Sequence, residues 1–329
     1  MLIPRVITSQ IAHVLVTIGF LTAIPLIAVA QNAYPNRPIK IIVPLSAGAT
    51  ADFLPRIVAA KLSLRWGQPV IIENRPGAAL NLGAEVVARA EPDGYTLLAS
   101  PPVPLVIAQS LYSELPFDPT AFVPVTVLCT LPNTLIARPN LPVANLAELV
   151  AYAKKNPGEL TYASAGRGST PHLAGEAFQI AAEIRMVHIP YKGLAPALTD
   201  VLAGHVDMMF DNIGNTLVRI KQGTVKGIAV TSKERVPDLP ELPTLAETYP
   251  GFYSATWFAV VAPPRTPPEI AAKLSQAIAE ILKLPDLLAK FKTFLCSPVG
   301  SSPAETATFL KEERERWHKV IETAGIKPE

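Results

Sequence analysis

The sequence predicts an α/β protein in which two lobes, each with a parallel-rich sheet, are joined by two hinge crossings. Three observations support this fold class. Short apolar runs rich in β-branched residues alternate with stretches of helical periodicity, this alternation occurs in two separate parts of the chain, and two long β-rich segments flank the second part. Strand–helix–strand repeats of this kind form parallel sheets with helices on their faces.

The first part of the chain opens with the apolar run IKIIVP, which is typical of a strand buried on both faces. Pro55 is tolerated in the following helix because it falls near the first turn. Asn81 is the expected N-cap of the next helix. The expected elements are a strand at 39–44, a helix at 51–66, a strand at 70–73, a helix at 82–90 and a strand at 96–99.

The second part repeats this rhythm and predicts a second α/β unit. Its expected elements are a helix at 146–155, a strand at 160–163, a helix at 170–184, a strand at 186–189, a helix at 196–203, and strands at 206–210 and 226–231.

Two extended apolar segments, 123–137 and 254–262, are the expected crossings between the lobes. Helices at 267–282 and 303–324 would then return to the first lobe. The layout is a clamp that closes about a ligand cleft between the lobes. The predicted division is 31–128 with 258–329 for the first lobe, and 129–257 for the inserted second lobe.

Residues 1–30 have the three-part pattern of a secretory signal peptide. They carry a single charge, Arg5, then a largely apolar run at 14–27, and end on the small residues Ala28-Val29-Ala30. The run is shorter than the ~20 residues that span a bilayer. We therefore expect cleavage after Ala30 and export of the mature chain to the periplasm.

Composition and motifs exclude several classes of function. The formal net charge of +2 provides no electrostatic footprint for nucleic acid. The five histidines lack metal-ligand spacing, and no Gly-x-Ser-x-Gly elbow, phosphate loop or full dinucleotide fingerprint is present. Ser169 and His172 lie three residues apart without an orienting acid, so capping is favoured over catalysis. We expect no catalytic residue, no metal and no cofactor.

The two cysteines, Cys129 and Cys296, leave an alternative open. Export permits a disulfide bond, but the sequence does not show whether the two residues meet. Both lie in apolar strings, which favours two buried free thiols.

The first candidate binding segment is the turn at 44–52, PLSAGATAD, between a predicted strand and a predicted helix. Ligands of open α/β sheets bind at such strand ends. Small side chains let backbone N–H groups approach an anion, and the helix N-terminus favours negative charge. The alternative, equally weighted on the residues alone, is a structural turn with Thr50 as the N-cap.

The second candidate segment is the turn at 162–172, which also joins a strand to a helix. Gly166 and Gly168 expose backbone donors, and the neighbouring serines and Thr170 add hydroxyl groups. Arg167 adds a guanidinium fork that suits a carboxylate, or is a solvated turn residue. Two such turns, one in each lobe, would hold the two ends of a dianion.

Three further segments are weaker candidates. Tyr191 and Lys192 follow a strand and are candidates to face the cleft, or to be a core strand end and a surface lysine. Asp211 would accept a hydrogen bond from a ligand, or cap a helix. The loop at 73–78 is expected to be structural, with Asn74 or Arg75 bracing the first turn.

Eight short motifs occur in the order of a known family. They are YPNRPI at 34–39, ENRPGA at 73–78, PDGYTLL at 92–98, LTYASAG at 160–166, HIPYKG at 188–193, VDMMFDN at 206–212, IAVTS at 228–232 and AGIK at 324–327. In this order they resemble the Bug family of extracytoplasmic solute receptors, which serve tripartite tricarboxylate transporters. The resemblance covers essentially the whole mature chain.

The resemblance implies a type II periplasmic-binding-protein fold and a receptor for a small carboxylate, such as a di- or tricarboxylate, an acidic amino acid or an aromatic acid. We expect a monomer that delivers this ligand to membrane permease subunits. By residue match, the ligand would contact the two turns, and Asp211 would read its remaining part. The matching turn residues are Ser46, Gly48, Ala49, Thr50 and the supporting Asp52, then Ser164, Ala165, Gly166, Ser169 and His172.

The first turn departs from the family pattern Pro-Phe-x-Pro-Gly-Gly. Leu45, Ala47 and Ala49 replace phenylalanine, proline and the second glycine, and Ala79-Leu80 stands where a glycine pair is common. Added β-carbons restrict positive φ angles. In the second turn Arg167 replaces a residue that is usually small or uncharged, and we hypothesise that it pairs with a second ligand carboxylate.

Two other functions compete with transport. A receptor of the same fold would feed a signalling partner, and the sequence does not separate these roles. An exported hydrolase would need an activated nucleophile beside a base, which we do not find in the sequence.

Overall fold

The computed structural model describes residues 34–47 and 50–329. The predicted signal peptide, Gly48 and Ala49 lie outside the described residues. The chain from Arg37 to Glu329 forms one compact unit, which contains all the helices and strands of the described residues.

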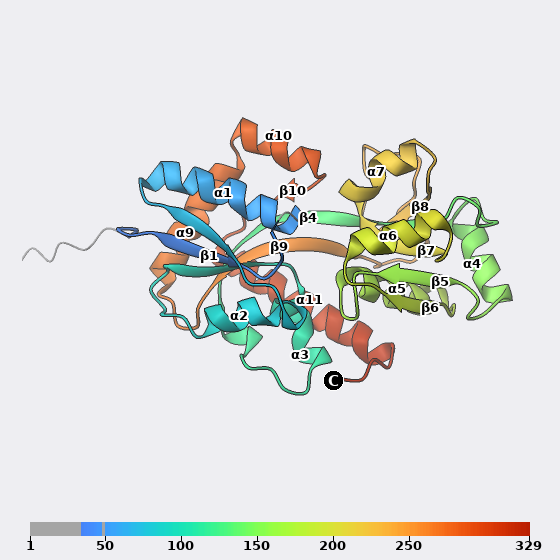
Figure 1. Ribbon diagram of the computed structural model, residues 1–329, viewed down its shortest axis with the longest axis horizontal. Helices are drawn as coiled ribbons and strands as arrows, with labels where there is room; N and C mark the ends of the chain where they lie inside the picture. The colour runs from blue at the N-terminus through green and yellow to red at the C-terminus, as the bar shows by residue number, and fades with distance from the viewer. Residues whose placement is uncertain (1–33, 48–49) are drawn as a thin grey trace, which may run out of the picture. The chain divides into compact units, whose positions relative to one another are not determined.

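The α/β prediction is confirmed by a ten-stranded sheet with helices on its faces (Figure 1). β8 and β10 pair with β4 beside the main path of the sheet. The main path runs, in spatial order, through β2 (Val70–Asn74), β1 (Ile39–Val43), β3 (Thr96–Ser100), β9 (Ala255–Ala262), β4 (Val123–Ala137), β7 (Met208–Asn212), β5 (Thr161–Ser164) and β6 (Val187–Pro190); β8 is Lys226–Val230 and β10 is Ser297–Pro298.

Two parallel groups of strands lie at the two ends of this sheet. β1 pairs in parallel with β2 and β3, and we call this group the first section. β5 pairs in parallel with β6 and β7, and we call this group the second section. The antiparallel strands β4 and β9 connect them, as Figure 1 shows. β4 has the bounds predicted for the first crossing, because its long β-branched run has no competing helical period.

Helices fill the connections between the strands. They are α1 (Thr50–Trp66), α2 (Asn81–Ala88), α3 (Ala108–Leu111), α4 (Leu146–Lys155), α5 (Thr170–Ala182), α6 (Leu194–Ala203), α7 (Ile213–Lys221), α8 (Leu245–Thr248), α9 (Pro268–Leu282), α10 (Pro285–Thr293) and α11 (Pro303–Thr323). Most predicted helices appear within a few residues of their expected bounds. α3, α7, α8 and α10 were not given bounds from the sequence, because their patterns are short and α10 starts directly after α9.

Each section has its own buried apolar core. In the second section, Phe178, Phe210 and Tyr162 are fully buried among the helices and strands. In the first section, Trp257 and Trp317 are fully buried, and the Trp257 indole donates to a Glu313 carboxylate oxygen at 2.7 Å. Burial of such rings contributes roughly 25 cal/mol per Å² of apolar surface removed from water.

A buried polar cluster ties β4 to the second section. The Asn133 side chain is fully buried, and its Nδ2 donates to Asn212 Oδ1 at 2.9 Å and to Thr256 Oγ1 at 3.4 Å. The Asn133 backbone N–H donates to Thr231 Oγ1 at 2.9 Å. These bonds join β4 to the ends of β7, β8 and β9. They also supply the hydrogen-bond partners that buried polar groups need.

The structure corrects two predictions. Asn81 does not cap α2: it is the buried first residue of that helix, and the N-cap position is Leu80, which has no side-chain acceptor. The free-thiol interpretation of the cysteines is also wrong, because Cys129 and Cys296 form a disulfide bond with a Cα–Cα distance of 5.8 Å. β10 lies against β4 with Pro298 opposite Cys129, and this non-local pairing was not visible in the sequence.

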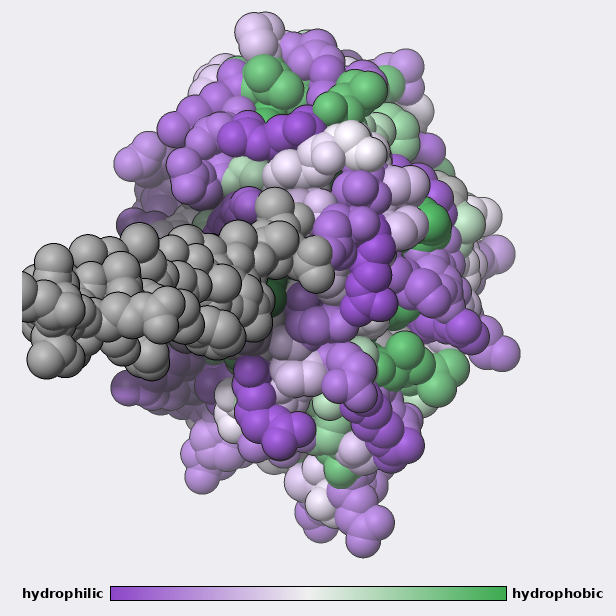
Figure 2. All heavy atoms as spheres, turned by 90° about the vertical axis from the view of Figure 1, so that its left-hand side faces the viewer, coloured by the Kyte–Doolittle hydropathy of each residue, from purple (hydrophilic) through white to green (hydrophobic). Residues whose placement is uncertain are grey.

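Hydrophobic side chains on the face shown in Figure 2 are divided into small areas by hydrophilic ones. Exposed apolar side chains are scattered through the described chain, with Leu64 of α1 at 80% exposure and Val218 of α7 at 57%. Scattered exposure of this kind is normal for a protein surface. Among the described residues, no helix is both long enough and apolar enough to cross a membrane.

Candidate functional site

The first predicted turn follows β1 and leads into α1. Ser46 is exposed beside the strand end. Asp52, in the first turn of α1, is only 3% exposed, and its carboxylate accepts from Arg56 Nε at 2.9 Å and Asn74 Nδ2 at 2.8 Å. The same Asn74 amide donates to the Leu45 carbonyl oxygen at 2.8 Å. The predicted bracing of this turn by Asn74 is therefore confirmed, and Asp52 holds the brace in place.

A strained loop follows the segment that braces the first turn. Arg75 pairs with Glu73, and the chain then passes through three consecutive residues with positive φ, Ala78, Ala79 and Leu80 at 46°, 48° and 75°. These include the positions where the sequence lacks the common glycine pair. A left-handed conformation costs a residue with a β-carbon roughly 1–2 kcal/mol. The chain therefore keeps the local geometry at the expense of stability.

We expect Ala79→Gly to stabilise the protein, because Ala79 is exposed and its substitution removes strain without loss of packing. The gain should be about 0.5–1 kcal/mol, since glycine also adds entropy to the unfolded chain. Urea unfolding at constant m-value measures it. Ala304→Gly in the exposed first turn of α11 is the control and should destabilise, as glycine does in helices. An equal loss in both variants would contradict the strain argument.

The second predicted turn is held by a dense set of hydrogen bonds. Ser164 is fully buried, and its hydroxyl bonds to both the N–H and the carbonyl of Gly166 at 3.1 Å. Ser169 caps α5: its hydroxyl donates to the Gly166 carbonyl at 2.7 Å and accepts from the His172 N–H at 3.4 Å. The predicted cap at the start of this helix is confirmed. These bonds define the path of the turn.

Two backbone donors of this turn remain available. The N–H groups of Ala165 and Arg167 form no hydrogen bond with any described residue. They lie at the carboxyl end of β5 and just before the N-terminus of α5, which carries a partial positive charge. The arrangement suits an anion at this end of the strand.

A histidine pair lies beneath the second turn. His188 Nε2 is 2.7 Å from Ser164 Oγ, and His172 Nδ1 accepts from the Gly168 N–H at 3.1 Å. The two imidazole rings stack with centroids 4.0 Å apart. Burial lowers the pKa of His172 to about 3 and that of His188 to about 4, so both rings are neutral at pH 7.

His188 was not singled out by its sequence. It belongs to the predicted strand at 186–189, and in the structure it lies opposite Tyr162 because β6 pairs with β5. The only available signal was the equal spacing of Tyr162 and His188 from the ends of their predicted strands. That signal requires the strand pairing to be known first.

Arg167 points away from the turn to which it belongs. Its guanidinium donates to the Lys327 carbonyl at 2.6 Å and lies 3.2 Å from a Glu329 carboxylate oxygen. The neighbouring Gly168 leaves no room for a β-carbon, which would lie 2.2 Å from a Leu111 methyl carbon. The second turn therefore contacts both α3 and the C-terminal segment. The pairing of Arg167 with a ligand carboxylate stays a prediction.

Tyr191 and Asp211 are both occupied by local partners. The Tyr191 hydroxyl donates to Asp200 at 2.5 Å, and burial followed by this bond raises the pKa of Tyr191 to about 12. Asp211 lies in β7 with no exposed surface, and its Oδ1 accepts from the Asn212 N–H and the Asn215 amide. Its Oδ2 has no hydrogen-bond partner among the described residues. Burial raises the pKa of Asp211 to about 7.

The structure therefore joins the residues of the second turn into one cluster with His172 and places Tyr191 beside it. Ser46 and Asp52 belong to the separate first turn. Asp211 lies near the carboxyl end of β7, just before α7, and Arg167 lies against the C-terminal segment.

Comparison with known proteins identifies the family. Residues 54–326 match the family model described as the tripartite tricarboxylate transporter family receptor. This chain belongs to that family. Protein BugT of Bordetella pertussis is 36% identical over 323 residues, which cover 97% of this chain and 99% of that protein.

Solved structures of similar proteins agree with this assignment. The R. palustris protein Rpa4515, solved with adipate, is 37% identical with a TM-score of 0.81 and covers 90% of this chain and 100% of its own. MatC of Rhodopseudomonas palustris, solved with bound malate, is 32% identical with a TM-score of 0.76 and covers 88% of this chain and 100% of its own. The family and its neighbours are solute-binding receptors with the periplasmic-binding-protein fold.

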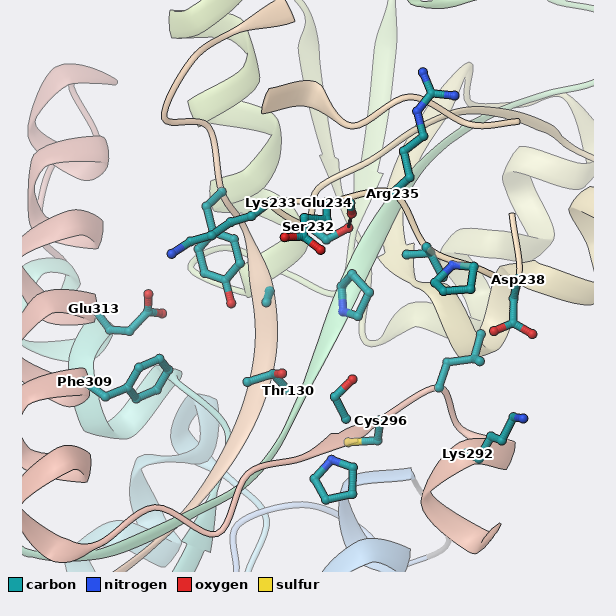
Figure 3. Close-up of a pocket in the computed structure, with 18 of the residues that line it drawn as sticks. Thr130, Ser232, Lys233, Glu234, Arg235, Asp238, Lys292, Cys296, Phe309 and Glu313 are labelled. Carbon is teal, nitrogen blue, oxygen red and sulfur yellow. Dashed lines mark hydrogen bonds between the residues drawn. The ribbon is translucent and has the colours of Figure 1, made fainter. Parts of the chain in front are cut away.

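This family member also has a groove away from the two turns (Figure 3). The groove has a volume of about 910 Å³ and lies over β4 and β9, between α10 and α11 and below the loop at 232–238. In its lining Arg316 binds Glu313, and Arg235 binds Glu247 outside the groove, whereas Lys233 and Lys292 form no ion pair with a described residue. The groove therefore has both paired and unpaired charges, and its lining shares no residue with either of the two turns.

Residues 34–47 and 50–329 contain no group of three or more histidine, cysteine, aspartate or glutamate side chains placed to hold a metal ion.

Proposed function

We propose that this receptor captures a small carboxylate in the periplasm, between the first and second turns, and delivers it to the membrane subunits of a tripartite transporter. The cleft would separate residues 31–128 and 258–329 from residues 129–257. Cleavage after Ala30 would release the mature chain, which would act as a monomer. The two ends of a dicarboxylate would contact the two turns.

The geometry of the second turn carries this proposal. The Ser164 and Ser169 hydroxyls both donate to the Gly166 carbonyl. The N–H groups of Ala165 and Arg167 bond to no described residue and remain as donors beside the N-terminus of α5. Backbone donors fixed in this way bind carboxylates without a charged side chain. Similar proteins solved with adipate and malate support a ligand of this class.

The remaining contacts of the ligand would come from side chains that now have local partners. Arg167 would exchange the Lys327 carbonyl and Glu329 for a second carboxylate. Asp211 would use its unpartnered oxygen for a hydroxyl or amine of the ligand. Asp52 would act indirectly, because its carboxylate is committed to Arg56 and Asn74.

We expect adipate, malate or another small dicarboxylate to raise the thermal midpoint of unfolding, while the uncharged dimethyl ester of the same acid does not. A ligand at one hundred times its Kd adds about 2.7 kcal/mol to the stability of the folded state. A thermal-shift screen followed by calorimetry measures the effect. A panel of di- and tricarboxylates, acidic amino acids and aromatic acids that produces no shift would refute the proposal.

A matched pair of capping variants locates the site in this experiment. Ser169 caps α5 at the second turn, and Ser302 caps α11 with the same side-chain bond to the third helical residue. Ser169→Ala and Ser302→Ala should each cost about 1 kcal/mol of stability. Only Ser169→Ala should weaken carboxylate binding. Equal affinities for the two variants would place the ligand elsewhere.

A further inference from the structure

Two stacked histidines hold the second turn at two different points. His188 comes from β6, and its Nε2 lies 2.7 Å from the Ser164 hydroxyl at the start of the turn. His172 comes from α5, and its Nδ1 accepts the Gly168 N–H at 3.1 Å in the middle of the turn. Each ring therefore fixes one polar group on either side of the Ala165 and Arg167 N–H groups, which bond to no described residue.

The rings themselves are held by their surroundings. Tyr162 stacks on His188 with centroids 5.0 Å apart, and its hydroxyl donates to Glu176 at 2.5 Å. That same Glu176 oxygen lies 3.7 Å from His172 Nε2. A β-carbon at Gly175 would lie 2.3 Å from the Tyr162 ring, so only glycine lets α5 approach this closely. These contacts restrict the movement of both imidazole rings.

The hydrogen bonds also define the protonation of His172. Because Nδ1 accepts a backbone N–H, it carries no proton, and the single ring proton belongs on Nε2, which faces Glu176. The charged or titratable groups near the pair are Arg167 of the turn, Glu176 of α5 and Tyr162 of β5. A second proton on His172 would remove the acceptor for Gly168 and add a charge beside His188.

We propose that His172 and His188 are positioning residues that set the direction of the backbone donors in the second turn and so determine ligand affinity. The inference rests on the proposed function, in which this turn binds the carboxylate. His172 is only 4% exposed and its Nδ1 is occupied, so it acts through Gly168 and not by touching the ligand. His188 acts in the same way through Ser164.

Amide side chains provide a crossed test, because asparagine places an oxygen near the position of a histidine Nδ1 and glutamine places an amide near Nε2. We expect His172→Asn to keep the Gly168 bond and an affinity within about threefold of wild type, and His172→Gln to lose about tenfold, the value of one hydrogen bond. At position 188 the order reverses: His188→Gln should retain affinity and His188→Asn should lose it. Calorimetry with adipate and malate measures all four.

Backbone amide exchange separates this inference from the proposed function. In the ligand-free protein, the Gly168 N–H should exchange faster in His172→Gln than in His172→Asn and wild type. If wild type binds none of the carboxylates, the proposed function fails while this pattern still reports on the histidine pair. Equal effects of asparagine and glutamine at each position, in both affinity and exchange, would show a purely structural role and overturn the inference.

A measurement on the wild-type protein tests the inference even where the variants do not fold. Nitrogen-15 NMR of the imidazole rings should show His172 as the neutral tautomer with its proton on Nε2. A proton on Nδ1 would be incompatible with the Gly168 bond and would overturn the inference without any substitution.

Discussion

Replacement of the disulfide by serines, in Cys129→Ser/Cys296→Ser, should lower the free energy of unfolding by about 2–5 kcal/mol. The bond joins residues separated by 167 positions, and both cysteines are buried, at 0% and 3% exposure. The cross-link restricts the unfolded chain, and its loss also leaves two hydroxyl groups in an apolar site. Guanidinium unfolding with and without a thiol reductant measures the change.

The reductant provides the internal control for this experiment. It should lower the stability of the wild-type protein toward that of the double variant and leave the double variant itself unchanged. Ser297→Ala, on the exposed neighbouring residue of β10, should change stability by less than about 0.5 kcal/mol. Equal stability of reduced and oxidised wild type would show that the cross-link contributes nothing.

The disulfide also anchors a contact between the two sections. Leu295, next to Cys296, packs on the second-section cluster formed by Ile213, Val230, Leu239 and Leu242. Gly214 at the start of α7 faces the Phe294 carbonyl so closely that a β-carbon would lie 2.7 Å from that oxygen. The segment after α10 is therefore fixed to β4 by the disulfide at Cys129. The residues just before Cys296, Phe294 and Leu295, contact α7 and the cluster beside it.

Asp211→Asn is expected to stabilise the protein increasingly as the pH rises. Burial raises the pKa of Asp211 from 3.8 to about 7, so between these values the folded state binds a proton that the unfolded state has released. The contribution of Asp211 to stability is therefore full below pH 3.8 and is lost as the pH rises through 7. Since each pH unit corresponds to ~1.4 kcal/mol, the variant should gain about 2–4 kcal/mol over wild type by pH 8.

Denaturant unfolding of wild type and Asp211→Asn at several pH values between 4 and 8 tests this expectation. Asp200→Asn is the matched control: the bond from Tyr191 lowers the pKa of the Asp200 carboxyl, so its removal should destabilise at neutral pH and not at low pH. A stability difference for Asp211→Asn that does not vary with pH would show that the carboxyl is already ionised in the folded protein. If Asp211 contacts the ligand, the stabilised variant should bind it more weakly.

Local patterns in the sequence were sufficient for most of the fold. The bounds of β4 and α4 were predicted correctly, because a long β-branched run and a regular helical period are each readable without knowledge of the neighbours. The bracing of the first turn by Asn74 was also foreseen, since polar residues at adjacent strand ends meet at one edge of a parallel sheet.

What the sequence did not reveal depends on contacts between distant segments. The disulfide requires β10 to lie against β4, and the histidine pair requires β6 to lie beside β5 and below α5. Ala79 and Leu80 were recognised as replacements for glycines, but Ala78 was not, and the surrounding structure determines that all three adopt positive φ.

The pairing of β4 with β9 determines how the two sections can move against each other. The disulfide fixes β4 to β10 at Cys129, and the buried cluster at Asn133 fixes it to the second section, so only Thr130–Pro132 lies between the two anchors. Thr130 also pairs with Ser297 of β10, so β4 and β9 form a narrow two-stranded ribbon at Leu131 and Pro132. A two-stranded ribbon can bend and twist. Sliding one section past the other would instead break the backbone hydrogen bonds between β4 and β9. We therefore expect rotation about this short stretch to be the easiest motion between the two sections.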